Sequence, residues 1–512
     1  MLEDPDRSSR FGIFYFDLCF DVAVFRALWY YKLHNRKQEG LIMKNTIVRI
    51  ESVEIKNFKN VNYGFLSFTN TRETFHSSIL GLYGQNGSGK TALIDSLALL
   101  QLALSGRSVP GTFANYINVG SSNATLKYEF RVTNRSESSS YSVFYEFSIR
   151  KDFSETELND NRANMPEESY KATVYDEVLS YSYESDSKKV KLLPIVDTRT
   201  DKVFVPKVKY DELVGKSKET LTNLLVARKY VEATSRSFVF SRELLNTLRK
   251  NCIEKYHLSL FENLIFFGRY ELFVINTINS GLISMNALPL AFNYKEGDHA
   301  SVGRLMINLN EPSFIPQDAM GIVEKVIKSM NVVLTQLVPG LTISLKDLGA
   351  QLDPNGGSGC RIQLMSNKNN KEIPFKYESE GIKKIVSVLQ LLIVIYNNPS
   401  MTVAIDELDS GIFEYLLGEL LRIISEKGEG QLIFTSHNLR ALETLNKGFI
   451  AFTTINPQNR YIRLGNVKPS NNLRDFYYRD IVLGEQNESV YEPTNNYEIA
   501  LAFREAGDMS GS

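Results

Sequence analysis

The segment that most constrains how this chain can fold is Gly84–Thr91, which reads GQNGSGKT and matches the pattern G-x-x-x-x-G-K-[ST]. It falls between a short apolar run that ends in glycine, Ser77–Gly84, and a segment with helical spacing, Thr91–Leu104. Between a strand and a helix, such a turn lets backbone N–H groups surround phosphate oxygens at the positive end of the helix dipole. The alternative is a glycine-rich turn with a capping threonine. We favour a nucleotide site, because the predicted strand and helix supply the context that it requires.

The residue types in this loop predict how it binds a nucleotide and its metal ion. Lys90 is expected to reach the β- and γ-phosphates of ATP, and the hydroxyl of Thr91 is expected to ligate Mg²⁺. The sequence therefore predicts ATP and Mg²⁺ as cofactors. The loop residues that we expect to bind the nucleotide are Gly84, Asn86, Gly87, Ser88, Gly89, Lys90 and Thr91.

Two adjacent carboxylates, Asp406 and Glu407, follow the apolar run Met401–Ile405, and Asp409 comes two residues later. Like charges at the end of a buried strand repel each other and are poorly solvated. An acidic turn after a strand is the alternative. A phosphate-binding loop, however, needs a second strand whose terminal aspartate holds Mg²⁺ through water. We therefore expect Asp406 to be a metal ligand together with Thr91, and Glu407 to orient or deprotonate the attacking water.

Two further polar sites follow from their positions along predicted elements. The segment FTSHN, Phe434–Asn438, ends the next apolar strand and puts His437 at the same sheet edge, where it can hydrogen-bond the γ-phosphate. The alternative for this histidine is a polar loop residue. Ser379 and Gly381 stand just before a long apolar helix. A helix N-cap is the alternative there, and we favour a second anion-binding helix start, for a γ-phosphate bound by another molecule.

The remaining patterns predict an α/β fold. Residues 46–68 alternate as strands, and period-2 segments between about 124 and 192 predict an antiparallel sheet. Residues 210–340 have mainly helical patterns. An apolar helix over 381–396 is followed, in 401–436, by the strand, helix, strand order of a parallel sheet.

Composition and charge limit the possible partners. The 58 Lys and Arg residues nearly balance 59 Asp and Glu residues, so no global basic field attracts nucleic acid or an anionic membrane. Three well-separated cysteines without paired spacing predict a reducing, cytoplasmic setting. Local phosphate contacts stay open, and so does the alternative of a solvated face, for Lys188, Lys189, Lys191, Lys383 and Lys384.

The N-terminal stretch Phe11–Leu33 is apolar, aromatic and long enough to suggest a membrane span. Asp17, Asp21 and Arg26 lie inside it, and each is expensive at membrane depth. The stretch also lacks the basic region and cleavage site of a signal peptide. We expect residues 1–42 to be an extension outside the functional fold, and we expect no membrane partner.

Taken together and in this order, the loop, the serine before the helix, the acidic strand end and the histidine resemble an ABC-type ATPase of the SMC and RecF kind. The early segment VEIKNFKN also resembles the start of that family. More narrowly, the chain resembles the AAA-type ATPases of bacterial anti-phage systems, the abortive-infection and overcoming-lysogenisation-defect relatives. The tail segments LRDFYYRDIVLGE and YEIALAFREAG add to that resemblance. The head motifs cover about residues 47–105 and 373–455.

The resemblance implies a homodimer or a higher homo-oligomer, in which two heads pair head-to-tail and enclose two ATP molecules. Each site would join the loop, the acidic pair and the histidine of one chain to Ser379 and Gly381 of the other. Asp409 is the expected coupling residue across that dimer, and hydrolysis would open it. The chain departs from the family in reading E-S-E-G-I where L-S-G-G-Q is usual. It also offers no convincing Q-loop glutamine, since Gln101 falls on the helix after the loop.

The domain organisation that follows is an ABC-type P-loop ATPase head with a mixed and antiparallel β lobe, a parallel-sheet lobe and a mainly helical insertion. The long separation between Lys90 and Asp406 requires such an insertion. The expected segments are 1–42 outside the fold, 43–205 as the first part of the head with the antiparallel β lobe, 206–340 as the helical insertion, 341–465 as the second part of the head, and 466–512 as a C-terminal tail.

Three functions are open to such an ATPase. The one we favour is an ATP-gated sensor or scaffold in anti-phage defence, which controls a separately encoded nuclease or toxin, because the chain after His437 is short and shows no nuclease motif. The second is a RecF-like DNA-repair ATPase that clamps duplex DNA, against which the near-neutral charge argues mildly. The third, a transporter subunit, is disfavoured by the long insertion and the missing glutamine. We expect hydrolysis of ATP to ADP and phosphate to be slow.

Overall fold

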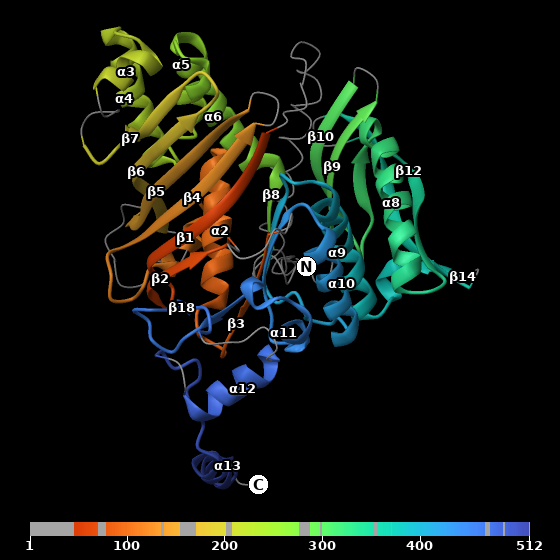
Figure 1. Cartoon of the computed structure of the whole chain (residues 1–512). Coiled ribbons are helices and arrows are strands. Elements are labelled where there is room, and N and C mark those ends of the chain that lie inside the picture. Colours follow the sequence, from red (N-terminus) through yellow and green to blue (C-terminus); the bar gives the residue numbers. More distant parts are fainter. Residues whose placement is uncertain are drawn as a thin grey trace, which may run out of the picture.

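The structure is a computed structural model in which two sheets flank a central helix, α2, and further helices and strands cover the second sheet (Figure 1). In Figure 1 the antiparallel sheet lies on the left, and α8, α9 and α10 lie on the right. Residues 1–42, expected to lie outside the fold, are outside the described residues. The described residues are 46–69, 78–134, 138–153, 170–200, 207–275, 287–296, 299–352, 356–369, 371–465, 472–484 and 487–510.

The first sheet is antiparallel and has the strand order β2-β1-β4-β5-β6-β7. Alternate residues of β4 from Ala124 to Val132 are buried and the residues between them are not, which is the period of a sheet with one covered face. The antiparallel sheet predicted for residues 124–192 is therefore confirmed. Its strands are β1 (Thr46–Phe58), β2 (Val61–Ser67), β4 (Asn123–Asn134), β5 (Ser139–Phe153), β6 (Tyr170–Glu184) and β7 (Lys189–Asp197).

The second sheet has the order β18-β17-β3-β16-β15-β8, and all its strands are parallel except β18. Every residue of β15, β16 and β17 is buried, as expected for parallel strands covered on both faces. This confirms the predicted parallel sheet. Its strands are β3 (Ser78–Tyr83), β8 (Leu272–Ile275), β15 (Thr402–Ile405), β16 (Gln431–Thr435), β17 (Ile450–Thr453) and β18 (Tyr461–Ile462).

Helix α2 (Lys90–Ser105) and one buried glutamine join the two sheets. Gln431 of β16 donates from Nε2 to the carbonyl of Ile50 in β1 at 2.8 Å, and its Oε1 accepts the hydroxyl of Thr402 at 3.1 Å. The two lobes therefore share a core at the base of the head. The apolar residues that give α2 its helical spacing have no exposed surface, as predicted: Leu93, Ile94, Leu97 and Leu100.

Residues 206–340 differ from the expected, mainly helical insertion. Strand β8, in the middle of this stretch, pairs with β15 and forms the edge of the parallel sheet, so the chain returns to the head there. Its four residues, LFVI, are too few for periodicity to separate a strand from the end of a helix. The other elements are α3 (Lys207–Val214), α4 (Lys218–Ala233), α5 (Arg242–Asn251), α6 (Lys255–Phe266), β9 (Ala287–Glu296), β10 (His299–Asn308), β11 (Ser313–Pro316) and α8 (Gln317–Leu337).

The C-terminal half completes the cover of the parallel sheet. It ends in helix α12, which packs on the body through Phe476 and Tyr477, and helix α13, which projects from it (Figure 1). Across the described residues, no helix is both long enough and apolar enough to span a membrane. The elements are β12 (Leu341–Leu352), β13 (Ser358–Lys368), β14 (Lys371–Pro374), α9 (Glu380–Asn397), α10 (Glu414–Lys427), α11 (Arg440–Thr444), α12 (Leu473–Leu483) and α13 (Asn496–Ser510).

A buried histidine makes the stability of the antiparallel lobe sensitive to acid. His257 of α6 has no exposed surface and is hydrogen-bonded at Nδ1 to the hydroxyl of Tyr181. Burial, aided by Lys209, lowers the pKa of His257 to about 4. The unfolded chain takes up a proton near pH 6.5 and the folded chain does not, so this stability is present above that pH and is lost as the pH falls toward 4.

We expect wild-type protein to lose about 2 kcal/mol more unfolding free energy than His257→Gln between about pH 7 and pH 4.5. Glutamine keeps a hydrogen-bonding group beside Tyr181 and does not titrate. Urea denaturation of both proteins at the two pH values measures the unfolding free energies. The carboxylates are the same in both proteins, so their titration cancels when the two pH-dependent losses are compared. The same loss in both proteins would contradict the assignment.

Candidate functional site

The carboxyl ends of three neighbouring parallel strands bring the predicted site together. Strand β16 pairs with β3 on one side and with β15 on the other. The loop Gly84–Thr91 follows β3, the acidic pair follows β15, and His437 follows β16. Asn86, Glu407, Asp409, Ser410 and His437 line one open pocket of about 380 Å³ at this edge. In an α/β sheet with parallel strands, ligands bind at this edge.

The loop has the shape of a phosphate-binding loop. Gly84 has a φ of +152°, and a Cβ there would lie 1.8 Å from the Thr453 hydroxyl, so only glycine fits. The hydroxyl of Ser88 points inward, to the carbonyl of Gln85. The Lys90 ammonium folds over the loop and donates to the carbonyls of Gly84 at 2.8 Å and Gln85 at 3.0 Å. These carbonyls hold the lysine above the start of α2, where phosphates would bind.

One hydroxyl organises the acidic pair. Thr435, the last residue of β16, donates its hydroxyl to Asp406 and accepts the backbone N–H of Glu407 at 2.8 Å. Glu407 has a φ of +49°, a left-handed conformation that is strained for a side chain larger than glycine. Asp406 is buried and Glu407 is exposed to the pocket. The two neighbouring carboxylates therefore have different environments, one suited to hold a metal and the other to meet water.

Asp409 ties the turn after the acidic pair to the loop that carries the histidine. Its Oδ2 accepts the backbone N–H groups of His437 at 3.1 Å and Asn438 at 2.9 Å. Its Oδ1 is buried and has no hydrogen-bond partner among the described residues. The side chain of Asp409, which we expected to act across a dimer, is thus bonded within its own chain through one oxygen. A movement of this turn would move His437 with it.

Two buried lysines balance the three carboxylates. The pKa of Lys90 is lowered by burial, against the attraction of Asp406, Glu407 and Asp409. Lys384 of α9 is similarly buried, and its pKa is lowered by burial against the attraction of the same three acids, of which Asp409 acts most strongly. Both ammonium groups therefore lie in the field of one acidic cluster.

The start of α9 is the second predicted anion site, and it packs directly on the acidic turn. Ser379 is the N-cap of α9, and its hydroxyl accepts the N–H of Ile382 at 3.4 Å. A Cβ on Gly381 would lie 2.8 Å from the carbonyl of Gly411 in the turn. Ser379 is exposed and does not line the pocket. The N-cap is confirmed, and service to another molecule's nucleotide stays a prediction.

The structure places the remaining candidates away from the pocket. Gln101 donates to the carbonyl of Leu272 at the start of β8 and so serves the base of the sheet. Lys383 and Lys384, which we considered as surface phosphate contacts, are both buried. Their position on α9 explains the difference, because this helix is covered on most of its circumference.

The donor set fits Mg²⁺ that arrives with a nucleotide. In the part of the chain that the structure describes, no group of three or more His, Cys, Asp or Glu side chains forms a metal cage. Mg²⁺ is usually held by one or two carboxylates together with phosphate oxygens. The Thr91 hydroxyl and the Asp406 carboxylate would supply such ligands, and the buried Asp409 Oδ1 adds an unsatisfied acceptor nearby.

Sequence patterns missed several residues that shape the site. Thr453 and Tyr461, both from the second half of the chain, support the loop: the Thr453 hydroxyl bonds Ser88, and the Tyr461 hydroxyl donates to the carbonyl of Gly89 at 2.9 Å. Thr435 had one available signal, since it is a polar residue at the end of an apolar strand. Lys384 was considered only as a surface residue, because a lysine on a helix is normally exposed.

A family model and several solved structures are similar to this chain. Residues 52–245, which include the loop, match the family model of the AAA domain. No curated protein matches the chain significantly. Among solved structures, the chain is similar to the Smc head domain with an extended coiled coil bound to the C-terminal domain of ScpA from Pyrococcus furiosus, with 13% identity, a TM-score of 0.36, and coverage of 82% of this chain and 96% of that chain.

Two further solved structures have the same level of similarity. The SMC head domain from Thermotoga maritima has 14% identity and a TM-score of 0.33, and the match covers 81% of this chain and 99% of that chain. The recombination mediator protein RecF with ATP has 12% identity and a TM-score of 0.33, and the match covers 82% of this chain and 100% of that chain. The AAA domain match and the geometry of the loop together support a nucleotide-binding ATPase of the P-loop type.

Proposed function

We propose that this chain is an ATP-gated switch in which two copies pair through bound ATP and separate when ATP is hydrolysed. The observation that carries the proposal is the incomplete pocket. Asn86, Glu407 and His437 are among the residues that line it, while the exposed Ser379 of the same chain lies outside its lining. An N-capped helix start is suited to an anion, so Ser379 is free to serve a nucleotide on a second copy.

Exposed aromatic side chains around the same contact support a second copy as the occupant. Tyr377 is 68% exposed, Phe413 is 72% exposed and Tyr415 is 55% exposed. They flank the contact between the start of α9 and the acidic turn, where Gly381 meets Gly411. Exposed aromatic groups beside a polar site are typical of interfaces.

A subunit-mixing experiment tests the pairing. Lys90→Ala should inactivate the loop, and Gly381→Val should inactivate the helix start, because a Cβ at this position would lie only 2.8 Å from the Gly411 carbonyl. A mixed dimer of these two chains would contain one site with an intact loop and an intact helix start. We expect the mixture to regain ATP-dependent dimerisation, measured as mass, that neither variant shows alone.

The mixing experiment has one control and one outcome that would contradict the proposal. In the control, Lys90→Ala is mixed with wild-type chains after each has been assayed alone. Its dimerisation gives the recovery expected when a mixed dimer has one intact loop. If Gly381→Val alone dimerises with ATP as wild type does, the helix start plays no part in the partner's site and the proposed pairing is wrong.

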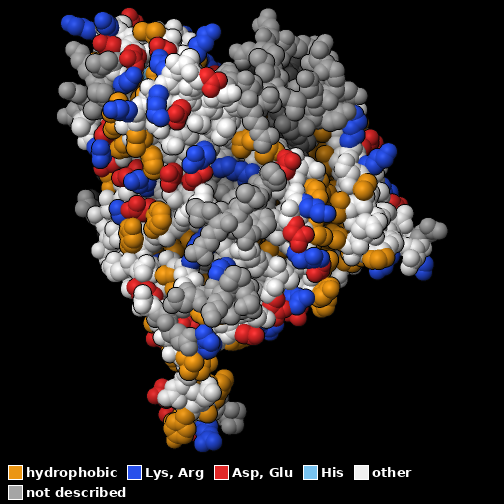
Figure 2. All heavy atoms as spheres, viewed as in Figure 1, with side chains coloured by type: hydrophobic (Ala, Val, Ile, Leu, Met, Phe, Trp, Pro, Cys, Tyr) orange, Lys and Arg blue, Asp and Glu red, His pale blue; other side chains and the backbone are white. Residues whose placement is uncertain are grey.

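We further propose that the switch controls a separately encoded effector, a nuclease or toxin, in anti-phage defence. The support is the resemblance to defence ATPases and the exposed apolar side chains of the projecting helix α13 (Figure 2), where Tyr497 is 72% and Phe503 is 76% exposed. Phage plating on cells that carry the chain with its neighbouring genes tests this role. Protection that disappears in Lys90→Ala supports it, and equal plaque numbers with and without the genes would contradict it.

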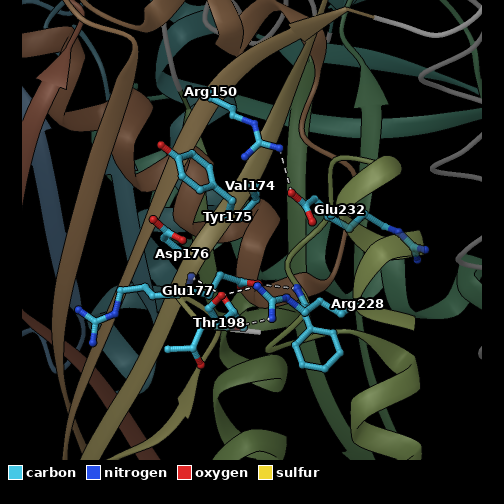
Figure 3. A pocket seen from close by; sticks show the side chains of 12 residues that line it. Arg150, Val174, Tyr175, Asp176, Glu177, Thr198, Arg228 and Glu232 are labelled. Atoms are coloured by element: carbon cyan, nitrogen blue, oxygen red, sulfur yellow. Dashed lines mark hydrogen bonds and ion pairs between the residues drawn. The ribbon is translucent and has the colours of Figure 1, made fainter. Parts of the chain in front are cut away.

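DNA binding is the second candidate, and one observation favours it. A pocket of about 160 Å³ between β6, β7 and α4 is lined by Arg150, Arg199, Arg228 and Arg236 (Figure 3). All four are engaged within the chain: Arg150 pairs with Glu232 at 3.0 Å and Arg199 with Asp197 at 2.6 Å, while Arg228 donates to the carbonyl of Thr200 and Arg236 to the hydroxyl of Thr234. Strongly salt-dependent binding of duplex DNA would favour this function over effector control.

A further inference from the structure

Lys384 stands out because it is a buried cation to which the nucleotide chemistry of the loop and the acidic pair assigns no role. Its residue is 3% exposed. Within the described residues, its ammonium makes no hydrogen bond or ion pair, whereas the neighbouring Lys383 pairs with Glu380 at 3.0 Å. A lysine is rarely buried in this way, because removing an ammonium from water costs several kcal/mol unless charges or hydrogen bonds compensate it.

The packing of α9 on the acidic turn explains where that compensation comes from. A Cβ built on Gly411 of the turn would lie 3.9 Å from Cβ of Lys384, and Gly381 meets the Gly411 carbonyl one helical turn earlier. The close approach of two glycines therefore sets the lysine beside Asp409 and the acidic pair. The attraction of these three carboxylates opposes the burial that lowers the pKa of Lys384.

The cluster then has a defined charge balance. Asp406, Glu407 and Asp409 contribute three negative charges, and Lys90 and Lys384 contribute two positive charges. Lys90 is already engaged by two loop carbonyls, which carry no net charge. The other cation of this pair, Lys384, comes from helix α9.

We propose that Lys384 is a positioning residue that acts as a built-in counter-cation for the acidic cluster and thereby sets how strongly the site depends on Mg²⁺. The inference rests on the proposed ATP-binding function. The lysine repels a divalent cation placed at Asp406 and Thr91, and it attracts the free ATP anion.

The proposal predicts opposite effects of Lys384 on the binding of Mg²⁺-bound ATP and of free ATP. Removing the positive charge should strengthen binding in the presence of Mg²⁺ relative to binding in EDTA. For a unit charge several ångströms from a divalent ion in a partly solvated site, we expect this Mg²⁺ enhancement to increase about 5- to 20-fold. The linkage is reciprocal, so the enhancement measures the coupling between Lys384 and Mg²⁺ directly.

The experiment measures the affinity of a fluorescent, non-hydrolysable ATP analogue with saturating Mg²⁺ and with EDTA. Wild type, Lys384→Met and Lys384→Gln are compared, and Lys383→Met is the matched control, since this adjacent buried lysine pairs with Glu380 instead. We expect weaker binding in EDTA and a larger Mg²⁺ enhancement in both Lys384 variants, with wild-type values in the control. The melting temperature of each variant is measured to check that it is folded. One folded Lys384 variant is enough for the comparison.

The possible results separate the inference from the proposed function. If wild type does not bind the analogue, the proposed function fails before any variant is compared. If wild type binds it and the Lys384 variants weaken binding equally with and without Mg²⁺, the lysine has a structural role only and the inference is overturned. An equal change in Lys383→Met would overturn it as well.

Discussion

Replacing Glu407 with glutamine is expected to slow ATP hydrolysis by about 100-fold or more while ATP stays bound. The side chain lines the pocket beside His437, and its backbone is held by the Thr435 hydroxyl at 2.8 Å. Glutamine keeps the size of the side chain and loses the basicity that activates water. Hydrolysis then stops after binding, and the ATP-bound dimer accumulates. Mass measurements with and without ATP, and a hydrolysis assay on the same sample, check both parts.

Glu414→Gln is the matched control, because this glutamate is exposed in the first turn of α10 and does not line the pocket. It should hydrolyse ATP as wild type does. If Glu407→Gln also hydrolyses ATP at the wild-type rate, Glu407 does not activate water, and the catalytic group must be sought elsewhere along the pocket.

Lys90→Ala is expected to weaken ATP binding by about 100-fold or more and to abolish ATP-dependent dimerisation. Charge-assisted hydrogen bonds contribute about 1.5–3 kcal/mol each, and the ammonium is placed to make two of them to phosphates. Its loss also removes one of the two buried lysines that offset the three carboxylates, so the site repels the ATP anion more strongly. Titration calorimetry with ATP and Mg²⁺ measures the change.

Lys56→Ala serves as the control for charge removal, because Lys56 is half exposed and pairs with Glu54 on the surface of β1. Its ATP affinity should match that of wild type. Wild-type affinity in Lys90→Ala would mean that the loop does not bind phosphates, and the proposed switch would fail with it.

Local sequence determined the elements that carry the site. The glycine-rich loop lies between β3 and α2, and the acidic pair and His437 follow β15 and β16, as their positions after apolar runs predicted. These features are readable because strand and helix periodicity, and the glycines of a phosphate-binding turn, depend on neighbours in the chain. Parallel pairing then brings the strand ends to one edge.

Only the tertiary structure decided which residues support those groups. Thr435 reaches Asp406 across 29 positions, and Thr453 reaches Ser88 across 365, so no local pattern could connect them. Lys384 was expected at the surface, and the packing of α9 on the acidic turn buried it. Strand β8 was expected to be helical, and pairing with β15 made it an edge strand. In each case the stabilising contacts are made with residues distant in sequence, and these contacts override the local conformational preference.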